Sequence, residues 1–104
     1  MGPMLAFFSI SPLGAGESVS GAVAKVIELI EKSGLEYTTT AMGTIIEGEP
    51  KAVFDLLFTC HELMQSEHPR VTSKILIDYR RGKSGRLSAK VDTLEHVLGH
   101  KISR

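Results

Sequence analysis

The strongest constraint on the fold is a pattern that occurs twice along the chain: an apolar strand, an amphipathic helix of about five turns, and another strand. Residues 4–42 and residues 43–81 each fit one such βαβ unit. In the first unit, Ala6, Phe8 and Ile10 share one face of the opening strand, as side chains two apart must. Two βαβ units within 104 residues predict an α+β ferredoxin-like sandwich.

The second unit has clear boundaries. Pro50 stands where a proline in the first turn of a helix is favoured, and Pro69 prevents that helix from continuing. In the strand that follows, residues 71–81, Ile75 and Ile77 share one face and charged residues occupy much of the other. We therefore predict the order βαββαβ, with a four-stranded antiparallel sheet and two helices on one of its faces.

The two ends of the chain lie outside this repeat. Val91, Leu94 and Leu98 recur at helical spacing and predict an additional C-terminal helix, packed on a sheet edge or on a neighbouring subunit. We assign residues 4–104 to a single domain. Residues 1–3 show no periodicity and are interpreted as an N-terminal extension or a remnant of expression.

Composition excludes several classes of function. Twelve basic residues balance twelve acidic ones, so the chain has no general electrostatic attraction to nucleic acid or anionic membranes. A single cysteine precludes an intramolecular disulfide and favours a cytoplasmic location. The apolar N-terminal stretch is too short, and lacks the basic flank, for an export signal or a membrane span.

One face of the predicted sheet has no helix to cover it. That face would carry Phe7 and Leu76 among polar side chains, which would expose an apolar patch in a monomer. We therefore expect the protein to associate with itself through this face or through a sheet edge.

Residues that commonly form catalytic or metal sites lack the spacing such sites need. His61 has Gln65 four residues later, where a zinc protease helix needs a second histidine. His96 and His100 have that spacing but stand at a weak helix end, which favours a solvated pair. Cys60 lies on an apolar helix stripe, where a small hydrophobic residue is expected. We predict no enzymatic activity, no metal and no cofactor.

One cluster of basic residues stands near the end of the second unit and comprises Arg80, Arg81, Lys83 and Arg86. A fold of this topology can bind RNA through aromatic residues on its central strands, but residues 43–48 carry none. We interpret the cluster as a solvated loop and predict no nucleic-acid partner.

The remaining candidate site is a set of polar side chains on predicted strands: Ser9, Tyr37, Thr39, Thr44, Glu47, Asp78 and Arg80. Hydroxyls, carboxylates and an aromatic ring suit a small polar ligand, either neutral or cationic. Alternatively, Ser and Thr are simply good strand residues, and Asp78 pairs with Arg80 or Lys74 on a solvated or intersubunit face. The residues alone favour this second interpretation.

Five segments, in this order, resemble the YkoF-like thiamine-binding protein family: Ser11-Pro12-Leu13-Gly14, Ser33-Gly34-Leu35-Glu36-Tyr37, Met42-Gly43-Thr44-Ile45-Ile46-Glu47-Gly48, Arg70-Val71 and Ile77-Asp78-Tyr79-Arg80. The resemblance covers almost all of residues 4–100. It implies a ferredoxin-like domain that assembles through its sheets into homodimers or homotetramers. It also implies a protein of uptake or salvage that binds thiamine or its hydroxymethylpyrimidine part and catalyses no reaction.

The resemblance suggests roles for individual residues. Glu47 or Asp78 would hold the aminopyrimidine, Thr44 and Ser9 would add hydrogen bonds, and Tyr37 would pack on a ring. We accordingly predict a non-enzymatic, oligomeric binding protein for thiamine or a hydroxymethylpyrimidine-like compound. The alternative is a structural or regulatory oligomer that contacts other proteins and has no small-molecule ligand.

Overall fold

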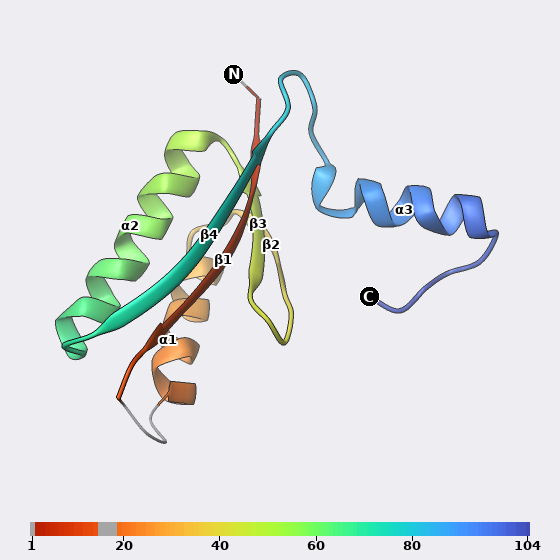
Figure 1. The fold of residues 1–104 in the computed structure, drawn as a ribbon. Helices are drawn as coiled ribbons and strands as arrows, with labels where there is room; N and C mark the ends of the chain where they lie inside the picture. Colours follow the sequence, from red (N-terminus) through yellow and green to blue (C-terminus); the bar gives the residue numbers. More distant parts are fainter. Residues whose placement is uncertain (1, 15–18) are drawn as a thin grey trace.

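The computed structural model of the protein describes residues 2–14 and 19–104. Its elements are β1 (Met4–Pro12), α1 (Val19–Lys32), β2 (Glu36–Thr39), β3 (Thr44–Gly48), α2 (Pro50–Glu67), β4 (Val71–Tyr79) and α3 (Arg86–Leu98). The four strands form one antiparallel sheet in the order β2-β3-β1-β4. Helices α1 and α2 cover one face of this sheet, whereas α3 extends on the opposite side (Figure 1). The predicted ferredoxin-like α+β fold, with its C-terminal helix, is confirmed.

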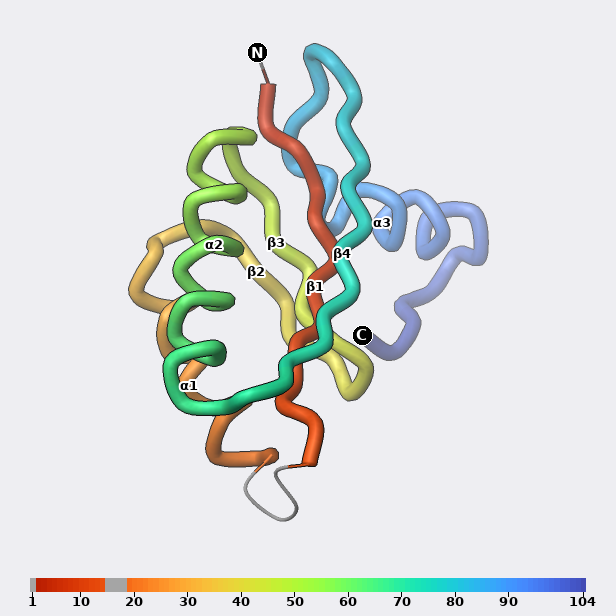
Figure 2. Tube along the Cα trace, turned by 60° about the vertical axis from the view of Figure 1, so that its left-hand side comes forward, coloured from red at the N-terminus to blue at the C-terminus, as the bar shows by residue number. Residues whose placement is uncertain are grey.

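The hydrophobic core lies between β1 and β3 on one side and α1 and α2 on the other. Burial alternates along β1, because side chains two apart share a face, so that Phe8 and Ile10 point at the helices. Figure 2 shows β1 between β3 and β4, one of the two inner positions in the sheet. The fully buried side chains of largest volume come from both layers: Ile30, Ile46, Met64, Val53 and Cys60.

Strand β2 is shorter than the sequence indicates. The composition predicts a strand over residues 35–41, but pairing covers only Glu36–Thr39. The hydroxyl of Thr40 ends it: this oxygen donates to the Gly43 carbonyl at 2.8 Å and accepts from the backbone N–H groups of Met42 and Gly43 at 3.2 Å. These bonds turn the chain into β3 and replace the ladder hydrogen bonds that a longer strand would make.

Close packing explains the glycine at the end of this turn. A Cβ atom at Gly43 would lie 2.6 Å from the ring Cζ of Phe7 and 2.9 Å from the carbonyl oxygen of Phe8. Because the second contact is with backbone, a side chain could be accommodated only by moving β1 or the turn. Gly43 therefore holds the β2–β3 turn directly against the central strand.

Strand β4 is an edge strand with apolar side chains on both faces. It pairs with β1 along its whole length, and within the described residues no strand pairs with its outer edge. Ile75 and Ile77 lie on the helix side but remain about two-fifths exposed, and Leu76 is 69% exposed on the other face. The strand ends at Tyr79, two residues before the predicted end, because the chain turns where the N–H of Lys83 donates to the Arg80 carbonyl.

The sheet face opposite α1 and α2 is called the open face below. By register it carries the side chains of Leu5, Phe7, Ser9, Ser11, Glu36, Thr38, Ile45, Glu47, Thr72, Lys74, Leu76 and Asp78. Helix α3 begins near β3 and β2, at one end of this face. Every residue of α3 is exposed or half-buried, so the helix leaves most of the open face uncovered. None of the described helices is long and apolar enough to cross a membrane.

Candidate functional site

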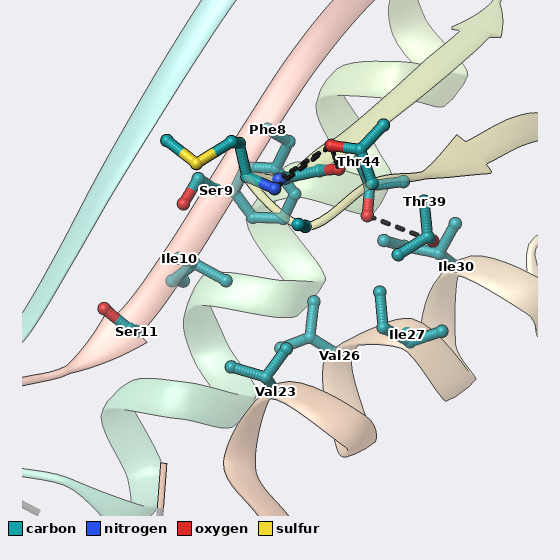
Figure 3. Close-up of a pocket in the computed structure, with 14 residues that line it drawn as sticks. Phe8, Ser9, Ile10, Ser11, Val23, Val26, Ile27, Ile30, Thr39 and Thr44 are labelled. Atoms are coloured by element: carbon teal, nitrogen blue, oxygen red, sulfur yellow. Dashed lines mark hydrogen bonds between the residues drawn. The ribbon is translucent and has the colours of Figure 1, made fainter. Parts of the chain in front are cut away.

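The seven candidate residues do not form one site. The structure brings three of them, Ser9, Thr39 and Thr44, to a cavity of about 220 Å³. This cavity lies between β1, α1 and the β2–β3 turn (Figure 3). Asp78 and Arg80 lie towards the opposite end of the sheet, beside the start of α3.

The cavity combines apolar walls with one polar corner. The walls are formed by Val23, Val26, Ile27 and Ile30 of α1 and by Phe8 and Ile10 of β1. In Figure 3 the α1 side chains point into the space between the helix and the sheet. The corner is the pair Thr39 and Thr44, whose hydroxyl oxygens lie 3.3 Å apart. These two residues are direct partners across the β2–β3 ladder, which explains why their side chains meet.

The threonine pair can still hydrogen-bond a ligand. Each hydroxyl carries one proton and two lone pairs, and the bond between the two consumes a single proton. Thr44 is only 3% exposed, so its unused hydrogen-bonding capacity lies at the buried end of the cavity. A flat ring with a polar edge would satisfy both properties of this cavity, with its faces against the α1 side chains and its edge against the threonines.

Ser9 contributes to the cavity through its main chain. Figure 3 shows the hydroxyls of Ser9 and Ser11 turned away from α1, as expected because Ser9 is the partner of Lys74 on the open face. Both serines also line a separate hollow of about 340 Å³ on that face, beside Phe7 and Lys74. The expected hydrogen bond from the Ser9 side chain is therefore available to a ligand on the open face rather than to one inside the cavity.

Tyr37 lies on the helix side of β2, opposite Ile46. Its side chain is partly buried and packs against the hydrophobic core. Tyr37 is not among the residues that line the cavity with Thr39 and Thr44. The ring therefore stabilises the sandwich beside the candidate site.

Glu47 belongs to the anchor of α3. The side chain lies on the open face, is 6% exposed, and accepts hydrogen bonds from the backbone N–H groups of Arg86 at 3.0 Å and Leu87 at 3.2 Å. These are the first two residues of α3, whose N–H groups have no partner within the helix. A carboxylate at this position also interacts favourably with the helix dipole. Glu47 thus fixes the start of α3 to the sheet.

Asp78 and Arg80 line a third hollow, of about 420 Å³, between the end of β4 and the start of α3. The guanidinium of Arg86 donates to the Asp78 carboxylate and forms an ion pair with it. This hydrogen bond is the main reason why the pKa of Asp78 lies below its usual value, and the charges of Arg86, Arg80 and Lys90 add to the effect. Asp78 is therefore ionised and paired at neutral pH.

The described residues hold no arrangement typical of nucleophilic catalysis or metal binding. Burial raises the pKa of the Cys60 thiol to about 11, so at neutral pH it is protonated and a poor nucleophile. The ring of His61 hydrogen-bonds the Leu57 carbonyl at 2.7 Å and the Ser73 hydroxyl at 2.8 Å, which ties α2 to β4. Within the described ranges no three His, Cys, Asp or Glu residues gather to hold a metal ion.

Two sets of residues at these hollows were not identified from sequence. Val23, Ile27 and Ile30 look like any other buried helix stripe, and only the empty space beside them marks them as cavity walls. Lys90 joins the hollow at Asp78 because the loop after β4 brings the start of α3 back to the sheet. No local pattern distinguishes this lysine from other exposed helix residues.

Comparison with known proteins places the chain among relatives of similar length. A family model described as thiamine-binding protein matches residues 6–95. A UPF0045 protein of Mycobacterium bovis is 38% identical over 96 residues, covering 91% of this chain and 94% of its own. A hypothetical protein of Methanocaldococcus jannaschii, of known crystal structure, is 35% identical, covers 90% of this chain and 97% of its own, and superposes with a TM-score of 0.82.

A third structure shows the same fold at lower identity. A candidate thiamine biosynthesis/salvage protein from Thermotoga maritima superposes with a TM-score of 0.80 and is 20% identical, covering 88% of this chain and 98% of its own. At this identity the likeness concerns the fold alone.

Proposed function

Because this chain belongs to the thiamine-binding protein family, we propose that it binds thiamine or a hydroxymethylpyrimidine-like compound and does not convert it chemically. The observation that carries the proposal is the cavity between α1 and the β2–β3 turn, where Thr39 and Thr44 form a polar corner in an apolar space. A protonated Cys60 and a hydrogen-bonded His61, both outside the residues that line this cavity, support binding rather than catalysis.

The size of the cavity favours the pyrimidine part of the ligand. Pockets that enclose whole drug-sized molecules measure roughly 300–1,000 Å³, and this cavity measures about 220 Å³. One aminopyrimidine ring fits such a space, whereas the thiazolium ring of thiamine would extend beyond it. The ring faces would pack on the apolar side chains of α1, and the amino group and ring nitrogens would meet the hydroxyls of Thr39 and Thr44.

Replacing Thr44 with valine is expected to weaken binding of hydroxymethylpyrimidine by about tenfold or more. Valine has nearly the shape of threonine, so the core packing is retained while the hydroxyl is lost. A polar group of the ligand would then lack its partner beside a buried residue, which is costly. Calorimetric titration with hydroxymethylpyrimidine and with thiamine measures the change.

The matched control is Thr38→Val. Thr38 is an exposed residue on the neighbouring strand β2, and its side chain faces the open face rather than the cavity. This variant should bind as the wild type does. Absence of binding heat with both ligands in the folded wild type would show that the cavity is not a pyrimidine site. Equal losses of affinity in the Thr44 and Thr38 variants would show the same. The interaction-module alternative would then explain the fold better.

The proposal includes self-association into a homodimer or homotetramer. The outer edge of β4, which no described strand pairs with, offers backbone donors and acceptors to another strand, and Ile75, Leu76 and Ile77 add exposed apolar side chains on both faces. A second copy of the chain matches this edge, since two β4 strands can pair antiparallel about a two-fold axis. Such pairing would join the two sheets into one.

Replacing Leu76 with glutamate is expected to reduce the assembled protein to single chains, because it places a charge in the apolar part of this surface. Light scattering coupled to size-exclusion chromatography gives the mass. Phe58→Glu is the control: Phe58 is 64% exposed on α2, and it faces away from the sheet. A wild type that is monomeric at high concentration, or a loss of assembly only in the Phe58 variant, would rule out assembly through β4.

A further inference from the structure

Positive charge is concentrated in the hollow between the end of β4 and the start of α3. In a chain whose net charge is zero, the described residues that line this hollow include four cationic side chains and one carboxylate. The cations are Arg80, Lys83, Arg86 and Lys90, and the carboxylate is Asp78. The local excess of charge is therefore strong although the whole protein has none.

These side chains come from three parts of the chain that the fold brings together. Arg80 follows β4, Lys83 belongs to the loop that leads to α3, and Lys90 lies in the first turns of the helix. Asp78 is ion-paired with Arg86 and is also close enough to Arg80 and Lys90 for their charges to lower its pKa. One carboxylate can neutralise one cation, so three positive charges remain around a single hollow.

We propose that this hollow binds the phosphate group of a small phosphate ester. Lysine and arginine are the main phosphate ligands in proteins, and the hydroxyl of Ser84 adds a neutral donor to the same lining. The volume of the hollow, about 420 Å³, lies within the range of small-molecule sites, roughly 300–1,000 Å³. The hollow therefore has room for an organic group beside the phosphate.

The lining favours a small ester over nucleic acid. Single-stranded nucleic acid is usually bound by aromatic side chains on which the bases stack. None of the described residues that line this hollow is aromatic. The N–H groups of Arg86 and Leu87 at the start of α3 are already bound to Glu47, so side-chain cations would hold the anion.

The hollow is a separate site from the pyrimidine cavity. Leu5 lines the hollow and Ser9 lines the cavity, and the four residue steps from one to the other along extended β1 correspond to about 13 Å. An ester in the hollow would link β4, the loop and α3 through Arg80, Lys83 and Lys90. Binding would therefore restrain α3 on the sheet, and this effect does not depend on occupation of the cavity.

The experiment is calorimetric titration of the full chain with inorganic phosphate and with ribose 5-phosphate, at fixed ionic strength. We expect both to bind, with the ester at least as tight as the free anion, and sulfate to compete weakly. The double variant Lys83→Gln, Lys90→Gln should raise the dissociation constant of the ester by about tenfold or more. It should leave hydroxymethylpyrimidine binding unchanged, which separates this test from that of the cavity.

The matched control is Arg81→Gln. Arg81 belongs to the same basic loop but is not among the residues lining the hollow, so its replacement should leave ester binding unchanged. The proposal is overturned if neither titrant binds at millimolar concentration, or if the Arg81 variant loses as much affinity as the double variant. A short single-stranded RNA that binds more tightly than the ester would overturn it in favour of a nucleic-acid surface.

Discussion

Replacing Ile46 with alanine is expected to lower the free energy of unfolding by about 2–5 kcal/mol. Ile46 is fully buried on β3, opposite Ala6 of the central strand, and its side chain faces the helices. Removing three carbons would leave a void among side chains that are held by both layers of the sandwich. Since close-packed interiors relax only partly around such a void, the lost contacts are not recovered.

The neighbouring residue provides the control. Ile45 has the same side chain on the same strand but faces the open face, where it is only half-buried. Ile45→Ala should therefore cost less than half as much. Urea unfolding followed by circular dichroism measures the free energy of unfolding of both variants. Each is made in the Leu76→Glu background so that assembly does not contribute. Equal decreases in the free energy of unfolding in that background would contradict the assignment of the two residues to opposite faces.

Replacing Glu47 with alanine is expected to release α3 from the sheet while the core stays folded. The carboxylate accepts hydrogen bonds from two backbone N–H groups at the start of α3, and a hydrogen bond to a charged group contributes a net of about 1.5–3 kcal/mol after its exchange with water. The rest of α3 buries little surface that could compensate. Hydrogen exchange of the α3 amides should accelerate by about tenfold to a hundredfold, while the amides of β1 and α2 keep their protection.

The control for this variant is Glu36→Ala. Glu36 lies directly opposite Glu47 on β2, on the same face, but is exposed. Its removal should leave exchange in α3 unchanged. If the Glu47 variant exchanged its α3 amides no faster than the wild type, the helix would have to be held by other contacts, such as the Arg86–Asp78 ion pair.

The fold could be predicted because local patterns determine it. Alternation along β1 and the stripe of α2 each specify a buried face without reference to distant residues. The first-turn position of Pro50 is a local property too and is observed. The predicted end of β2 was wrong because it depends on the Thr40 hydroxyl, which closes the turn through bonds that composition does not reveal.

The arrangement of the site depends on which face each strand residue occupies. Thr44 and Glu47 are three residues apart on one strand, so they must point to opposite faces and cannot line the same hollow. Strand alternation alone therefore separates these two candidates into two locations. The role of Glu47 could not be inferred in this way. Its partners Arg86 and Leu87 lie about 40 residues later in the chain, beyond β4 and the loop that follows it.

The central position of β1 has a consequence for synthesis on the ribosome. The first strand to be made needs two partner strands, and about 60 residues separate Pro12 from the second of them, which begins at Val71. At 5–20 residues per second, that interval takes roughly 3–12 s. During this interval the apolar stretch from Met4 to Ile10 has no β4 to pair with. The nascent chain is thus most exposed to misassociation before β4 emerges, and cellular chaperones would act on it at that stage.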